Sequence, residues 1–157
     1  MTKAFVAQRK ERRSPEPKVV RSNRTERAMT TIQKGEVAFL KCSLRAIELN
    51  IIMSKPTTDA RYDAVLDHRG HLQRAQIKYC DRKPSKSSGS VELRLERHGK
   101  TYSATEIDVV LVYMPMVDRI LYLPTKYFDG KKTITLRHTA PANGQTHGVQ
   151  LASRFFW

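Results

Sequence analysis

The stretch RYDAVLDHRGHLQRAQIKY, residues 61–79, predicts two β-strands joined by a tight polar turn at residues 68–71. Apolar and polar residues alternate on both sides of this turn. Because side chains two positions apart on a strand share a face, Gln76 and Lys78 are expected to project together. Asp63 stands on the neighbouring strand of the same hairpin. An acid, an amide and a lysine in this arrangement are suited to hold a divalent cation beside an ammonium group, so we expect the chemistry here.

The composition points to a polyanionic partner. The chain has 157 residues with 29 Lys+Arg against 15 Asp+Glu, a net charge of +14. Such an excess favours nucleic acid as the partner, although a basic housekeeping protein accounts for the charge equally well. No apolar run approaches the roughly 18 residues of a membrane-spanning helix, so we expect no membrane partner. Cys42 and Cys80 lack metal-ligand spacing, and we expect buried thiols in a reducing cytoplasm.

The first residues differ from the rest of the chain. Residues 1–28 are rich in Lys and Arg and show no apolar periodicity, which predicts a disordered basic extension. The length of the remainder suits a single globular domain over residues 29–157.

One helix is predicted, over residues 33–50. Val37, Leu40, Leu44 and Ile47 recur at spacings of three and four, and this apolar stripe is expected to face the core. Thr30 or Thr31 is suited to cap the helix, which would place Glu36 in its first turn.

The other elements are predicted to be strands, and they lie at residues 51–54, 91–95, 107–114, 119–123 and 131–137. The nearly continuous apolar run at 107–114 is typical of a central strand that is covered on both faces. The aromatic residues 155–157 are expected to fill the core or a subunit contact. The fold class is therefore α/β, with a mixed central β-sheet and few flanking helices.

Glu36 on the helix, Asp63 on the hairpin and Gln76-Ile77-Lys78 on the next strand resemble the core of the PD-(D/E)XK nuclease superfamily. The resemblance covers residues 33–123. Local features are similar to the homing endonucleases carried by cyanobacterial group I introns, and they are Gly35-Glu36, Arg61-Tyr62-Asp63, Arg74-Ala75-Gln76-Ile77-Lys78, and Ile107-Asp108 before Tyr113-Met114-Pro115.

The resemblance implies a restriction-endonuclease-like core in a bacterial cytoplasmic protein. It implies a homing endonuclease that cuts both strands of a long double-stranded DNA target with Mg²⁺, or with Mn²⁺ in its place, and promotes intron mobility. It also implies a homotetramer. Two alternatives remain open: a restriction endonuclease or Holliday-junction resolvase on the same core, and a non-catalytic DNA-binding protein with a decayed site.

The sequence departs from the superfamily pattern at two positions. Tyr62 replaces the proline, which has little consequence, but Gln76 replaces an acid, and an amide oxygen is a weaker ligand for a hard cation. Either the site holds one metal ion where relatives hold two, or Glu36 supplies the missing charge. The resemblance favours Glu36, acting directly or through water.

The resemblance also implies a role for each residue of the motif. Asp63 and the backbone carbonyl of Ile77 would bind the cation, which hydrolysis of a phosphodiester requires against the developing negative charge. Lys78 would orient the attacking water and offset charge in the transition state. Gln76 would complete the coordination or position that water.

Basic residues outside the motif are candidates for DNA contacts. Lys83 and Lys86 lie in a predicted flexible loop, and Arg94 with Arg97 is suited to enter the major groove on a β-ribbon. A further basic edge consists of Lys131, Lys132 and Arg137. The alternative is that these are solvated surface charges. Because one small chain cannot read a long site alone, we expect a homo-oligomer.

Overall fold

The computed structural model describes residues 28–141, 144 and 148–157. The extension predicted at residues 1–28 lies outside these residues, apart from its last position. The described elements are α1 (Thr31–Glu48), β1 (Ile52–Ser54), β2 (Ala64–His68), β3 (His71–Tyr79), β4 (Ser90–Arg94), β5 (Glu96–Arg97), β6 (Lys100–Thr101), β7 (Val109–Met114), β8 (Arg119–Pro124), η1 (Thr125–Tyr127), β9 (Thr133–Arg137) and η2 (Ala152–Phe155). None of the helices in this part of the chain is long and apolar enough to cross a membrane.

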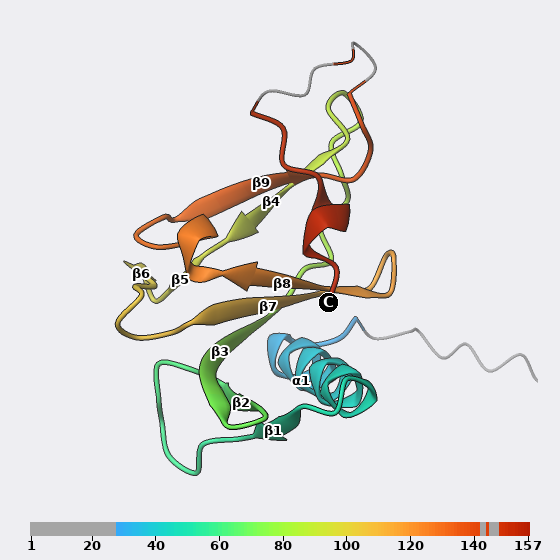
Figure 1. Cartoon of the computed structure of the whole chain (residues 1–157). Helices are drawn as coiled ribbons and strands as arrows, with labels where there is room; N and C mark the ends of the chain where they lie inside the picture. The colour runs from blue at the N-terminus through green and yellow to red at the C-terminus, as the bar shows by residue number, and fades with distance from the viewer. Residues whose placement is uncertain (1–27, 142–143, 145–147) are drawn as a thin grey trace, which may run out of the picture.

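A mixed sheet of five strands, in the order β1-β2-β3-β7-β8, forms the centre of the fold. Strands β3 and β7 are parallel, and the other neighbours are antiparallel. Strands β4 and β9 pair with each other as a separate two-stranded ribbon. Figure 1 shows this ribbon above β7 and β8, with α1 on the other side of the sheet. The predicted α/β class and mixed sheet are confirmed.

The hairpin of β2 and β3 has the predicted strands and turn. Its register runs from Ala64 opposite Ala75 to His68 opposite His71. Arg69 and Gly70 adopt φ values of 55° and 85°, and the Gly70 amide donates to Asp67 Oδ1 over 2.7 Å. Strand β3 has nine residues and β2 has five, so β3 extends beyond its partner toward Tyr79.

Strand β7 is the central strand that its apolar sequence predicts, because all six of its residues are buried. Val110, Val112 and Met114 pack with β4 and β9 in one core cluster. The alternate residues Val109 and Leu111 pack with α1 in a second cluster. The sheet therefore has one face covered by the helix and the other by the ribbon.

The start of α1 follows the predicted capping chemistry. Thr30 is the N-cap: its hydroxyl accepts from the Gln33 amide over 3.2 Å, and Gln33 Oε1 accepts from the Thr30 amide over 2.8 Å. This reciprocal capping box satisfies two amides that the first turn leaves unpaired. The sequence predicted Glu36 in the first turn of the helix. Because the helix begins at Thr31, Glu36 lies in the second turn instead.

The prediction that the apolar stripe of α1 faces the core is wrong. Leu40, Leu44 and Ile47 are 64%, 55% and 70% exposed, and only Val37 of the stripe packs partly against the core. The residues that face the sheet are small ones, and they are Ala38, Cys42 and Ala46. Small side chains let the helix lie close to the sheet, and the large apolar side chains then lie on the solvent side.

The remaining core predictions are mostly confirmed. Cys42 and Cys80 are buried free thiols, and burial raises the pKa of the Cys42 thiol to about 12. Among the last three residues, Phe155 packs in the core beside the ribbon, whereas Phe156 is 43% exposed. Trp157 packs partly against the helix-side cluster.

The inverted packing of α1 gives a test. We expect Ala46→Leu to destabilise the protein by about 1–3 kcal/mol, because it overpacks the contact between helix and sheet. Leu44→Ala should change the free energy of unfolding by less than about 0.5 kcal/mol, as at other exposed positions. Urea unfolding at low protein concentration measures both values. A larger loss for Leu44→Ala than for Ala46→Leu would show that the stripe faces the core.

Candidate active site

The candidate site lies where β3 continues without β2. The Asp63 amide donates to the Ala75 carbonyl over 2.9 Å, and β2 begins at the next residue. Further along β3, the Ile77 amide donates to Asp63 Oδ2 over 2.8 Å. The Asp63 carboxylate therefore accepts from a β3 amide that has no partner on β2. Because the N–H and C=O of one strand residue point to the same edge, the Ile77 carbonyl faces this open edge too.

Gln76 lies beside Asp63 on the ribbon side of β3. Its Nε2 donates to Asp63 Oδ2, while its Oε1 is buried and has no hydrogen-bond partner in the described part of the chain. A buried acceptor without a partner costs about 1–3 kcal/mol. The two ends of a side-chain amide can exchange by a flip, which would turn Oε1 toward Asp63. A cation between the two groups would then satisfy both oxygens.

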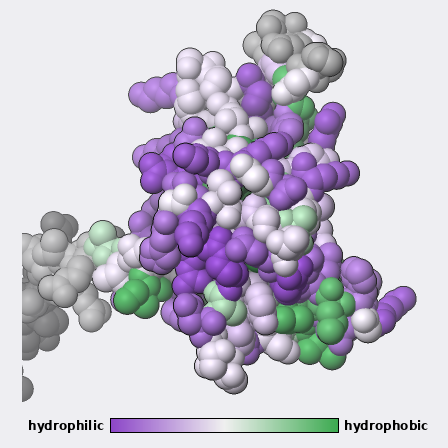
Figure 2. Space-filling view, turned by 90° about the vertical axis from the view of Figure 1, so that its left-hand side faces the viewer, coloured by the Kyte–Doolittle hydropathy of each residue, from purple (hydrophilic) through white to green (hydrophobic). Residues whose placement is uncertain are grey.

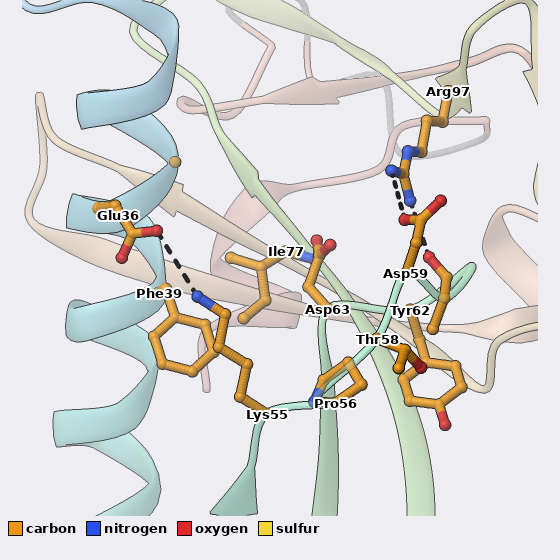
Figure 3. Close-up of a pocket in the computed structure, with 12 residues that line it drawn as sticks. Glu36, Phe39, Lys55, Pro56, Thr58, Asp59, Tyr62, Asp63, Ile77 and Arg97 are labelled. Carbon is orange, nitrogen blue, oxygen red and sulfur yellow. Dashed lines mark hydrogen bonds and ion pairs between the residues drawn. The ribbon is translucent and has the colours of Figure 1, made fainter.

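Asp63 and Ile77 border a cavity of about 280 Å³. It is lined by Gly35, Glu36, Phe39, Lys55, Pro56, Thr58, Asp59, Ala60, Tyr62, Asp63, Ile77 and Arg97. Figure 3 shows Asp63 and Ile77 between the helix that carries Glu36 and the segment that carries Asp59 and Tyr62. The cavity thus lies at the open edge of β3, between α1 on one side and the segment before β2 on the other.

Glu36 reaches this cavity from α1. Its Oε1 lies 3.6 Å from Lys55 Nζ, and both side chains are 59% exposed. Lys55 Nζ also lies 5.0 Å from the centre of the Phe39 ring. Glu36 and Asp63 line one cavity, and no hydrogen bond joins these two described residues. A Glu36 contact to a cation through water therefore stays a prediction.

Lys78 points to the same side of β3 as Gln76 but lines a neighbouring cavity of about 360 Å³. Its Nζ donates to the Glu96 carbonyl over 3.0 Å and lies 5.1 Å from the centre of the Tyr102 ring. Burial lowers the pKa of Lys78, while Asp63 and Glu96 act in the opposite direction. The partly buried Lys78 side chain is therefore held by specific contacts on the ribbon side of β3.

Burial also sets the electrostatics of Asp63. It raises the pKa of the Asp63 carboxyl above its ordinary value, against the hydrogen bond from Ile77 and the positive charges of Arg97 and Lys78. The surrounding groups therefore do not fully compensate the charge of this carboxylate. A bound cation would supply the missing compensation.

The oxygen donors at the open edge suit a hard cation. Asp63 offers a carboxylate, Ile77 a backbone carbonyl and Gln76 an amide oxygen, which are the ligand types that Mg²⁺ and Ca²⁺ take. The described residues contain no cluster of three or more His, Cys, Asp and Glu side chains at metal-binding distances. With Asp63 as its carboxylate, the donor set of Asp63, Ile77 and Gln76 fits a cation that is bound through oxygen.

Three cationic or aromatic side chains lie at the site although the sequence analysis did not assign them to it. Arg97 was assigned to a DNA-reading ribbon, but it lines the cavity, where it donates to the Ala60 carbonyl over 2.8 Å and to Asp59 Oδ1 over 3.1 Å. Tyr102 is buried between the Arg61 and Lys78 side chains, and burial raises its pKa to about 12. Lys55 pairs with Glu36, and no sequence signal indicated this.

The other predicted DNA contacts lie around the ribbon of β4 and β9. Lys83, Lys86, Lys131 and Lys132 are exposed. Arg94 is exposed on β4, and Arg137 is partly exposed at the end of β9. Their contact with DNA stays a prediction.

The sequence matches a known protein family over most of its length. Residues 29–156 match a family model described as PD-(D/E)XK endonuclease. Among solved structures, the fold is similar to that of a bacterial homing endonuclease, I-Ssp6803I, with a TM-score of 0.63 and 21% sequence identity. That likeness covers 82% of this chain and 88% of the other. A search of curated proteins found no match.

The raised pKa of Asp63 predicts a pH-dependent cost in the cation-free protein. Because burial raises the pKa, folding favours the protonated acid, and this contribution is complete below the ordinary value of 3.8 and is lost as the pH rises through the raised value. In EDTA at neutral pH, Asp63→Asn should therefore be more stable than the wild type, with a difference that shrinks toward pH 4. Urea unfolding between pH 4 and 8 measures this difference.

Asp59→Asn is the matched control, since Asp59 lines the same cavity with a side chain that is 90% exposed. Asp59→Asn should not be more stable than the wild type at neutral pH in EDTA, because it loses the ion pair with Arg97. Equal stability of the wild type and Asp63→Asn at pH 7 in EDTA would contradict the assignment.

Proposed function

Because the chain belongs to the PD-(D/E)XK endonuclease family, we propose that it is a site-specific homing endonuclease that hydrolyses both strands of a long DNA target. Its cleavage would promote the mobility of a group I intron. The observation that carries this proposal is the convergence of Asp63, Ile77 and Gln76 at the open edge of β3. The similar fold of a bacterial homing endonuclease supports this branch of the family.

Asp63, the Ile77 carbonyl and Gln76 Oε1 would hold Mg²⁺, or Mn²⁺ in its place. When bound, the cation would act as a Lewis acid on the scissile phosphate. Glu36 would contribute negative charge from the other side of the cavity, through water. The Glu36 carboxylate is exposed and paired only loosely with Lys55, at 3.6 Å, which leaves it able to turn toward the site.

Lys78 is the candidate for handling the attacking water. Burial, the Glu96 carbonyl and the Tyr102 ring hold its amino group on the ribbon side of Gln76. A cationic group fixed there would orient a water molecule and offset the charge that develops on the phosphate. This electrostatic stabilisation of the transition state is strongest in a site from which bulk water is excluded.

A second copy of the chain is part of the proposal, and four copies follow from the family resemblance. Leu40, Leu44 and Ile47 form an exposed apolar stripe along the outer face of α1. Exposed apolar stripes of this kind mark interaction surfaces. A copy of the same chain suits this surface because a long DNA target requires several reading units. The two reduced, buried cysteines agree with action in a bacterial cytoplasm.

Two other functions use the same fold. A restriction endonuclease or junction resolvase would share the chemistry and differ in substrate, with a resolvase preferring four-way junctions to linear duplex. A non-catalytic DNA-binding protein would retain the basic surface, with Gln76 as the mark of a lost activity. Metal-dependent cleavage separates this last case, because a chain with a charge of +14 binds DNA in any event.

The experiment that tests the function is cleavage of a plasmid that carries an intronless copy of the host gene. Discrete linear product is expected with Mg²⁺ or Mn²⁺, and none after removal of the cation with EDTA. Asp63→Ala should give no product. Cleavage of a four-way junction in preference to the plasmid would instead favour a resolvase. Unchanged cleavage in EDTA would contradict the proposed role of the cation.

Lys78→Ala separates binding from chemistry. We expect the cleavage rate to fall by about 10²-fold or more, the size of the effect when one group that stabilises transition-state charge is removed. The affinity for the target should stay within a few-fold, since Lys78 is partly buried and its amino group is held by the Glu96 carbonyl. Single-turnover cleavage and gel-shift titration measure the two quantities. Near wild-type cleavage by Lys78→Ala would overturn its assignment.

Leu44→Glu tests the proposed contact between copies. A carboxylate in the apolar stripe would have to be desolvated in the interface, so we expect the oligomer to dissociate by at least one step. Sedimentation velocity of the wild type and the variant measures this change. The control is Leu72→Glu, because Leu72 is also an exposed leucine but lies in β3 and not in the apolar stripe of α1. A monomeric wild type, or an unchanged oligomer with Leu44→Glu, would exclude this surface.

A further inference from the structure

We propose that the outer face of the β4–β9 ribbon reads base edges in the DNA major groove, with Arg94 as the side chain that recognises guanine. This inference rests on the proposed function as a DNA endonuclease. It deepens that function by naming the surface that selects the target sequence. The register of the ribbon, the distribution of its charges and its place beside the candidate site carry the argument.

The ribbon has one apolar and one polar face. Val91, Leu93, Ile134 and Leu136 pack into the core on one side. The other side is built from three cross-strand pairs, which are Ser90 with Arg137, Glu92 with Thr135, and Arg94 with Thr133. Figure 2 shows that the upper part of the molecule, which carries the ribbon, is largely hydrophilic, while apolar groups gather at the level of α1 and β1. The buried face holds the polar side chains on a fixed frame.

The polar face contains the side-chain types that read bases. Arg recognises guanine through two hydrogen bonds, Ser and Thr pair with several base edges, and Glu accepts from the amino group of cytosine. A two-stranded β-ribbon is also one of the elements that fits the major groove. The Arg94 side chain is exposed and makes no hydrogen bond or ion pair within the described part of the chain. Its guanidinium is therefore available to a base.

The lysines flank the ribbon and are absent from its polar face. Lys83 and Lys86 lie on either side of Ser85, whose amide donates to the Ser90 carbonyl at one end of β4. At the other end, the Lys132 carbonyl accepts from the Leu95 amide, and Lys131 precedes it. All four lysines are exposed. Lysine contacts phosphates as a point charge, without reading sequence.

The spacing of the two lysine pairs agrees with the width of a groove. Each strand of the ribbon has five residues, which at roughly 3.3 Å per residue span about 16 Å. The major groove is about 12 Å wide between its phosphate backbones. A ribbon that crosses the groove would thus place one lysine pair on each backbone and its central side chains on the bases.

The ribbon lies next to the candidate active site. Glu92 and Arg94 line the cavity that Lys78 also lines, and Ile77 borders both this cavity and the one with Asp63. DNA that rests on the ribbon would therefore pass close to the catalytic groups. Glu92 adds discrimination: it pairs with Arg82 at 3.4 Å, and a carboxylate facing a groove repels any base that cannot donate to it.

The test selects bound sequences from a randomised duplex library with the full chain in Ca²⁺, and then measures cleavage of the enriched sequences in Mg²⁺. The wild type should enrich a defined site that contains G·C pairs. Arg94→Ala should lose roughly 10- to 100-fold of the preference at one G·C position in each half-site, the size of one bidentate base contact. Thr135→Val, which keeps the branched shape and loses the hydroxyl, should alter the adjacent position.

Two further variants serve as controls. Arg119→Ala removes an equal charge from an exposed position in β8, away from the ribbon, and should leave the preferences unchanged. Lys131→Ala should weaken binding to all sequences alike and reduce the salt dependence of the affinity. Thermal melting shows that each variant is folded.

The outcomes separate this inference from the proposed function. Enrichment of a site that Arg94→Ala no longer prefers, without cleavage by the wild type, would support the ribbon and overturn the nuclease. A wild type that binds without enrichment would overturn the ribbon as a reader of bases. Unchanged preferences in both Arg94→Ala and Thr135→Val would overturn it as well, whether or not the wild type cleaves.

Discussion

The hydrogen bond from the Ile77 amide to the Asp63 carboxylate is the constraint on which the site depends. Strand β2 begins at Ala64, while β3 continues to Tyr79, so the edge of β3 beyond Ala75 has no strand beside it. An exposed strand edge leaves backbone groups without partners. Asp63 satisfies one of them and is thereby fixed beside Gln76 and the Ile77 carbonyl. The cost is a carboxylate in a partly buried position, where desolvation raises its pKa.

The sheet keeps this edge in place through its two covered faces. Val110 and Val112 pack under the ribbon, and Val109 and Leu111 pack under α1, so β7 cannot shift without moving both layers. The parallel pairing of β3 with β7 is fixed at its start by Arg74 and Asp108. The Asp108 carboxylate accepts from Arg74 at three nitrogens, over 2.7, 3.0 and 3.0 Å. Two residues further along β3 is Gln76, so this ion pair sets the position of the motif relative to β7.

The sequence predicted the elements better than it predicted their faces. Strict alternation and a Gly turn define the β2–β3 hairpin, and a continuous apolar run defines β7, because both signals depend only on local geometry. The prediction of which face of α1 is buried was wrong. A stripe of Leu and Ile indicates where apolar area lies on the helix, but it does not indicate how closely the helix approaches the sheet. That distance is set by Ala38, Cys42 and Ala46. Arg97 lies on β5 and lines the cavity, outside the β4–β9 ribbon on which the sequence placed it, and its contact with DNA stays a prediction.

The amide at position 76 becomes understandable from the burial of Asp63. A second carboxylate there would lie in contact with Asp63 on the same face, and each charge would raise the pKa of the other. The amide avoids this repulsion and donates to Asp63. Under the proposed function, Glu36 would then supply negative charge from the helix side of the cavity, where its exposed carboxylate is paired with Lys55. Such a site would have one partly buried acid at the strand edge and one exposed acid, so that only one carboxylate loses much of its hydration.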